Sequence, residues 1–167
     1  MGKYDPAKSP LAEAKDGRPA FIRNVDDLPA EDYERGEIAG TARDLGEATG
    51  TKLLGVDITI IPPGKKSSHM HRHVHKEEFF YVLSGRCKVR VGMAEYELRP
   101  GDAVARPADS KEHHQFHNPY SEPCQVMMLG IMAGKGVEDV IEWPELGRVL
   151  RIDAEGGRKI EKVARAG

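Results

Sequence analysis

Histidine has the most informative distribution in this chain, because all seven histidines lie in two short segments. His69, His71, His73 and His75 alternate with other residues, and His113, His114 and His117 lie close together further along the chain. Side chains two positions apart on a strand share a face, so the alternating histidines can project together. Imidazoles combined with a carboxylate suit borderline divalent metals such as manganese, iron, cobalt, nickel and zinc. The spacing therefore predicts a divalent-metal site.

The segments that must position these histidines have the pattern of short β-strands. Alternating or β-branched runs separated by glycine and proline turns predict strands at 51–61, 78–83, 87–91, 95–98, 103–107, 113–118 and 124–132. Many short strands with turn signals at intervals of about 8–12 residues are typical of an all-β sandwich or barrel. A shorter strand is expected within 37–46, and a short helix within 137–143. The sequence therefore predicts an all-β domain.

The two histidine segments resemble the two signatures of the cupin superfamily. The first reads Gly64-x6-His71-x-His73-x4-Glu78-x6-Gly85, and the second reads Gly101-x5-Pro107 followed by His114-x3-Asn118. The chain departs from the pattern in three places. Its first glycine lies one residue further upstream, Asp109 stands near the position of the second signature's middle glycine, and the gap from Pro107 to His114 is two residues longer.

The resemblance implies a cupin barrel, which is a double-stranded β-helix or jelly roll, with metal ligands His71, His73, Glu78 and His114. His113 is an alternative fourth ligand, but the asparagine four residues after His114 favours His114. His69 is an alternative to His71, but it does not give the family's spacing to Glu78. Four protein ligands around a six-coordinate metal would leave two positions open for water or substrate. The resemblance also implies a homodimer.

Three further residues are candidates for substrate binding. Arg106 would bind an anionic group if it points inward, although a surface ion pair is the commoner role for an arginine at a strand end. Phe80 and Phe116 are expected to line an apolar pocket beside the metal. Lys65 and Lys66 are the other candidate anion contacts.

The same ligand set permits several reactions, so the sequence leaves the function open. The flanking segments resemble small single-domain bacterial cupins of the sugar-phosphate isomerase-like type. This resemblance implies an enzyme that uses the metal as a Lewis acid on a small polar metabolite. One alternative is an iron-dependent dioxygenase or other oxygen-using cupin. A second is a non-catalytic metal-binding, metabolite-binding or sensor protein.

Length and composition predict a single soluble domain with terminal extensions. The chain has 167 residues, of which 39% are hydrophobic and 31% charged, with a net charge of −2. This composition favours neither nucleic-acid nor membrane binding, and it leads us to expect a cytoplasmic protein whose two cysteines are packed thiols. We expect an N-terminal arm with short strands at 1–49, the barrel at 50–133 and a C-terminal tail or short helix at 134–167.

Overall fold

The computed structural model describes residues 18, 19 and 21–164; most of the predicted N-terminal arm, residues 1–17, lies outside this range. The elements in chain order are η2 (Val25–Asp27), β1 (Glu31–Arg35), β2 (Ile38–Asp44), α1 (Leu45–Thr49), β3 (Leu54–Ile61), β4 (Arg72–His73), β5 (Glu78–Ser84), β6 (Cys87–Val91), β7 (Ala94–Leu98), β8 (Ala103–Arg106), β9 (His114–His117), β10 (Cys124–Ile131), β11 (Asp139–Trp143), η3 (Pro144–Leu146), β12 (Arg148–Ile152) and β13 (Arg158–Lys162). No helix of these residues is both long and apolar enough to cross a membrane. The all-β prediction is confirmed.

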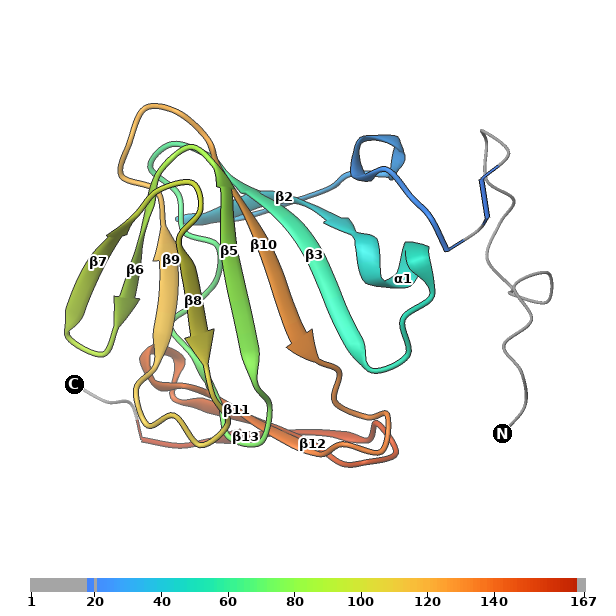
Figure 1. The fold of residues 1–167 in the computed structure, drawn as a ribbon. Coiled ribbons are helices and arrows are strands. Elements are labelled where there is room, and N and C mark those ends of the chain that lie inside the picture. Colours follow the sequence, from blue (N-terminus) through green and yellow to red (C-terminus); the bar gives the residue numbers. More distant parts are fainter. Residues whose placement is uncertain (1–17, 20, 165–167) are drawn as a thin grey trace.

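The strands form a barrel from two facing sheets, with a third sheet across one end (Figure 1). The larger wall has the order β1-β2-β3-β10-β5-β8, and the smaller wall has the order β7-β6-β9. The third sheet, β13-β12-β11-β4, joins the end of the chain to the first histidine segment. Every registered pair of strands is antiparallel, as expected for a jelly roll.

The barrel core follows from the alternation of side chains along the central strands. On β5, Phe80 and Val82 are buried while Phe79 and Leu83 on the opposite face are exposed. Antiparallel pairing places Phe80 beside Met128, so inward-facing residues of neighbouring strands meet in rows. The resulting apolar cluster contains Ile61, Phe80, Val82, Cys87, Val89, Leu98, Phe116, Cys124 and Val126. Both cysteines are free, as the sequence predicted.

The C-terminal segment differs from the prediction, because the expected helix within 137–143 is a strand. Residues Asp139–Trp143 form β11, which pairs with β12 on one side and with β4 on the other. β13 then pairs with β12, so the last part of the described chain is sheet rather than helix or loose tail. Pairing with β12, whose Val149 and Ile152 are buried, outweighs a weak local helical pattern. The boundaries at 49 and 133 stay predictions.

Two turns show why the signature positions favour glycine. Gly85, which separates β5 from β6, has a φ of 70°, and a Cβ atom there would lie 2.1 Å from the backbone oxygen of Pro123. Only glycine fits this turn. Asp109, near the position of the missing signature glycine, is the one non-glycine residue of the described chain with a positive φ, 63°. Asparagine and aspartate tolerate this conformation better than most residues, so the turn is kept without glycine.

Candidate metal centre

The four predicted ligands come from three separate parts of the barrel. His71 and His73 lie in the segment that includes β4, Glu78 is the first residue of β5, and His114 is the first residue of β9. Two backbone hydrogen bonds join His71 to His114: the His71 N–H donates to the His114 carbonyl at 3.1 Å, and the His114 N–H donates to the His71 carbonyl at 2.7 Å. The backbone therefore fixes the two histidine segments against each other.

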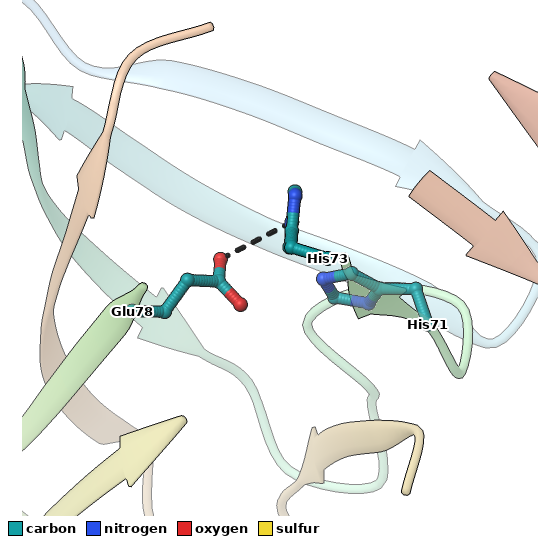
Figure 2. Close-up of side chains that lie close together, drawn as sticks. All are labelled: His71, His73 and Glu78. Atoms are coloured by element: carbon teal, nitrogen blue, oxygen red, sulfur yellow. Dashed lines mark ion pairs between the residues drawn. The ribbon is translucent and has the colours of Figure 1, made fainter. Parts of the chain in front are cut away.

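The side chains of these residues converge on Glu78. His73 Nε2 lies 3.3 Å from Glu78 Oε1, and His114 Nε2 lies 3.3 Å from Glu78 Oε2. The donor atoms of His71, His73 and Glu78 all lie within 4.8 Å of one another (Figure 2). The His71 and His114 ring centroids are 4.6 Å apart. The structure thus brings together the residues that the two signatures supply from distant parts of the sequence.

Unpartnered polar atoms at the centre of this cluster fit a metal ion. Glu78 Oε2 and His114 Nε2 are buried and lie 3.3 Å apart, but neither has a hydrogen-bond partner. Buried polar atoms without partners are rare because their desolvation is not compensated, and a cation would satisfy both atoms. Three imidazoles and one carboxylate form a donor set that suits a borderline divalent metal.

Hydrogen bonds behind two of the histidines orient their rings. His71 Nδ1 lies 2.8 Å from the His69 carbonyl oxygen, and His73 Nδ1 lies 2.5 Å from Asp139 Oδ2. With Nδ1–H as the donor in each case, Nε2 is free to face the cluster, which is a common arrangement behind metal-binding histidines. Asp139 is 1% exposed, and its other oxygen accepts the His75 backbone N–H. Asp139 was not among the predicted site residues, because the segment containing it was expected to be helical.

The electrostatics of the cluster favour the protonation states that bind metal. Burial, and then the neighbouring His114, lowers the pKa of His71 to about 4, so its imidazole is neutral at pH 7. Burial on its own would raise the pKa of Glu78, but the three surrounding histidines outweigh burial and lower it. Asp139 follows the same balance: burial opposes ionisation, and the contact with His73 lowers its pKa. His71 therefore presents a lone pair to the cluster, and Glu78 presents a carboxylate.

A cavity of about 270 Å³ opens beside the cluster. Its walls include the predicted pocket residues Phe80 and Phe116 as well as His71, Glu78 and His114; the other lining residues are Gly55, Asp57, Ser67, Ser68, Lys76, Met128, Leu129, Gly130, Ile131 and Met132. Part of this space exists because Gly55 and Gly130 occupy the row of inward-facing positions next to Glu78. The volume is just below the range of about 300–1,000 Å³ that is usual for small-molecule sites.

Comparison with known proteins identifies the family. Residues 57–130, which include β5 and all four predicted ligands, match the family model described as Cupin domain. Residues 57–130 are a cupin domain. The predicted resemblance is confirmed, and the barrel with its histidine cluster is the cupin domain of this protein.

Similar proteins with different names share this fold. An auxin-binding protein of Nicotiana tabacum is 30% identical over 129 residues, which are 74% of this chain and 64% of that protein. The chain spans less than two thirds of the length of the curated relatives that it matches. A candidate sugar phosphate isomerase from Acidithiobacillus ferrooxidans superposes with a TM-score of 0.77 at 23% identity, over 86% of this chain and 92% of that one. A sugar phosphate isomerase from Silicibacter pomeroyi superposes with a TM-score of 0.73 at 23% identity, over 86% and 95%.

Three other histidines of the cupin domain have a carboxylate neighbour outside the cluster. His113, the alternative fourth ligand, has its Nε2 3.6 Å from a carboxylate oxygen of Glu142, whereas its neighbour His114 faces Glu78. His75 is 40% exposed, beside Glu138. His117 lies 3.9 Å from Glu95. Of the two histidines at 113 and 114, the structure thus places His114 at the cluster.

The three basic residues that the sequence offered as anion contacts are already engaged. Lys65 forms an ion pair with Glu34 at 2.9 Å, and Lys66 forms one with Glu37 at 2.7 Å. Arg106 on β8 is opposite Glu78 on β5 in the strand register. Its side chain lines a small crevice beside the cupin cavity rather than the cavity itself. Its Nη2 donates to the Glu112 carbonyl at 2.6 Å, while its buried Nε has no partner. Substrate binding by Arg106 stays a prediction.

Proposed function

We propose that this cupin is an enzyme that binds one divalent metal through His71, His73, Glu78 and His114 and acts on a small polar metabolite. Isomerisation of a sugar phosphate is the favoured reaction. The proposal rests on two buried atoms without a hydrogen-bond partner, Glu78 Oε2 and His114 Nε2, next to a cavity of about 270 Å³. Structural metal sites are usually closed by protein ligands, whereas this cluster borders an open cavity, which supports catalysis.

Each part of the cavity has a defined role in this proposal. A divalent ion bound here would act as a Lewis acid that polarises a carbonyl group. Asp139 would hold His73 in the required orientation, and Phe80 and Phe116 would keep water from the carbonyl. The names of the two structural neighbours favour the sugar phosphate, although their identities of 23% support the fold alone.

Exchange of substrate hydrogen with solvent tests the isomerase. Aldose–ketose interconversion removes a proton from carbon, so incubation in D₂O should place deuterium in a phosphorylated sugar. The reaction is run without oxygen on protein loaded with manganese or zinc and followed by mass spectrometry. Glu78→Gln should remove the exchange, while His75→Ala should leave it unchanged. Lack of exchange by the native protein across a panel of aldose and ketose phosphates would refute this reaction.

A metabolite-binding or sensor role is the second candidate, and the similarity to an auxin-binding protein supports it. In that case the metal-loaded protein would gain thermal stability from a ligand without converting it. Product analysis of the stabilising ligands separates the two candidates. Oxygen uptake by iron-loaded samples with the same ligands tests the oxygen-using enzyme.

We also propose that the protein acts as a homodimer in the cytoplasm. Exposed apolar side chains on the outer face of the larger wall, including Phe79, Leu83 and Leu54, support pairing through that face. Light scattering coupled to size-exclusion chromatography would give the mass, and a monomer at micromolar concentration would contradict the dimer. Fractionation of cells that express the protein tests the location.

A further inference from the structure

Two charged side chains of the cavity lining are not among the proposed metal ligands. Lys76 lies in the turn before β5, two residues before Glu78, and Asp57 lies on β3. Neither residue was among the predicted site residues. Together with the metal cluster they give the cavity a distribution of charge that restricts what it can bind.

Lys76 is a cation next to the proposed metal centre that interacts with Asp139 through its charge but forms no ion pair in the described part of the chain. Its side chain is partly buried and lines both the main cavity and the small crevice beside Arg106. Within the described part of the chain, no hydrogen bond or ion pair is recorded for its ammonium group, whereas Lys65 and Lys66 are both paired with glutamates. A partly desolvated ammonium group at a cavity wall binds an anionic group of a ligand more strongly than an ammonium group in bulk water does.

Asp57 lines the same cavity from β3, which is two strands away from β5 in the larger wall. Strand pairing places Phe80, Met128 and Asp57 in one row, so these three side chains point to the same face, into the barrel. β10 separates β3 from β5, so the backbones of Asp57 and of Phe80 in the same row are about 9.5 Å apart across the sheet. Burial, and then the nearby Asp44 and Glu31, raises the pKa of Asp57. Its carboxyl group makes no recorded hydrogen bond in the described chain, so it is available to a hydroxyl group of a ligand.

The balance of charge explains why an anion would bind at one end only. Without a metal, the cavity has the carboxylates of Glu78 and Asp57 against the single ammonium of Lys76. A divalent ion at the cluster reverses the sign of the field on the Glu78 side, where Lys76 also lies, and leaves the Asp57 side negative. An anionic group is therefore attracted to the Lys76 side and repelled by Asp57.

We propose that the cavity selects a small hydroxylated metabolite with one anionic group, a phosphate or a carboxylate, which Lys76 binds while Asp57 contacts the hydroxyl-bearing end. Lys76 is then the residue that sets specificity for an anion, and Asp57 sets the orientation of the ligand. This inference rests on the proposed function because it concerns the same metal-loaded cavity, but it holds for an enzyme and for a binding protein alike.

Calorimetric titration of the manganese-loaded protein with four matched probes tests the proposal. The probes are inorganic phosphate, D-ribose 5-phosphate, D-ribonate and neutral D-ribose. The native protein should bind at least one of the two ribose-derived anions at least tenfold more tightly than ribose, and the chelated protein should bind that anion more weakly. Comparing ribose 5-phosphate with ribonate shows whether the anion is a phosphate or a carboxylate.

Variants at the two positions complete the test. Lys76→Gln should bind the anionic probe about tenfold more weakly than the native protein, and Lys76→Arg should retain most of the affinity. The matched control Lys65→Gln should bind the anionic probe like the native protein. Asp57→Asn should weaken binding of the ribose-derived anion relative to inorganic phosphate, because phosphate has no hydroxyl-bearing carbon chain for Asp57 to contact. Metal content and melting temperature, measured for every variant, show that the fold and the metal site are intact; if Lys76→Gln fails this check, Lys76→Met replaces it.

The outcomes separate this inference from the proposed function. Unchanged anion affinity in an intact Lys76→Gln or Lys76→Met, or equal binding of ribose and its anions by the native protein, overturns the inference. Lys76-dependent anion binding without any deuterium exchange supports the inference and refutes the isomerase. Deuterium exchange by a protein whose anion binding does not depend on Lys76 supports the isomerase and overturns the inference.

Discussion

The two ends of the barrel interior use the same strands for different purposes. On β5, Val82 and Phe80 are buried in the apolar cluster, and two positions further the inward-facing residue is Glu78. On β3, Ile61 lies in the apolar cluster while Asp57 lines the cavity. At the apolar end the buried side chains pack against one another, whereas at the polar end Glu78 Oε2 and His114 Nε2 have no hydrogen-bond partner. The first arrangement stabilises the fold, and the second is suited to bind something else.

Loss of the metal is the largest effect that we expect at the polar end. Glu78→Gln removes the carboxylate on which three histidines converge, so bound metal should fall from about one ion per chain to none. The variant should also unfold more easily than the native protein when both are chelated at pH 7, because the lowered pKa of Glu78 means that the surrounding histidines stabilise its carboxylate in the folded protein. Elemental analysis after dialysis and urea unfolding with chelator measure the two quantities.

The exposed His75 provides the control for this experiment. His75→Ala should keep the metal, because its side chain lies outside the cluster. Equal loss of metal from both variants would refute the ligand assignment.

A truncation at the apolar end should lower stability but keep the metal. Ile61 is 0% exposed, and Ile61→Ala should lower the free energy of unfolding by about 2–5 kcal/mol through lost burial and a cavity. The folded variant should still bind one metal ion. Met93→Ala, at a position that is 93% exposed in the turn between β6 and β7, should cost less than about 0.5 kcal/mol. If Ile61→Ala lost its metal while still folded, the two ends would not be separable.

Asp139 links the third sheet to the metal end and should have an intermediate effect. Asp139→Asn keeps the shape of the side chain but weakens the acceptor for His73 Nδ1, so metal affinity should fall by about 10–100-fold. Full stoichiometry should return at high metal concentration, which distinguishes orientation from ligation. Asp153→Asn, in the turn between β12 and β13, is the matched control. Native affinity in Asp139→Asn would contradict the role of Asp139.

The smallest expected effect concerns the ion pair that joins β4 to β11. Arg72 donates two hydrogen bonds to Glu142, at 2.6 and 3.0 Å, and this pairing lowers the pKa of Glu142. A lowered pKa in the folded protein contributes stability above the ordinary value of 4.5, and this contribution is lost as the pH falls through the folded value.

The free energy of unfolding of the native protein should therefore exceed that of Glu142→Gln by about 1 kcal/mol at pH 7. This difference should shrink as the pH falls below the ordinary pKa of 4.5. Urea unfolding at a series of pH values measures it. A difference that stays constant down to pH 3 would contradict this account of the pair.

The sequence predicted the barrel and the residues of the cluster because both depend on local patterns. Alternation marks the strands around Phe80 and Val89, and the spacing of His71, His73 and Glu78 is that of a known family. The partners of these residues depend on tertiary pairing, which one sequence does not show. Asp139 meets His73 only because β11 pairs with β4, and that strand was expected to be a helix.

Asp57 and Lys76 were missed for a related reason. Asp57 lies in a β-branched segment, and its direction into the cavity follows from the register of β3 with β10 rather than from its neighbours in sequence. Lys76 occupies a turn, where a lysine is usually solvated. Conversely, Lys65 and Lys66 were candidates because they precede the histidines, but the structure pairs them with glutamates at β1 and in the turn between β1 and β2.

The glycine pair Gly55–Gly130 gives this scaffold a simple means of changing which metabolites it accommodates. A methyl group on Gly130 would lie 3.6 Å from Glu78 Cγ, and one on Gly55 would lie 3.6 Å from Met132 Cγ; both are ordinary contacts. Neither glycine has a positive φ, so alanine fits the backbone at each position. Single substitutions at these positions could shorten the accepted ligand while leaving the metal chemistry and the hydrophobic core unaltered, so selectivity could diverge without loss of the fold.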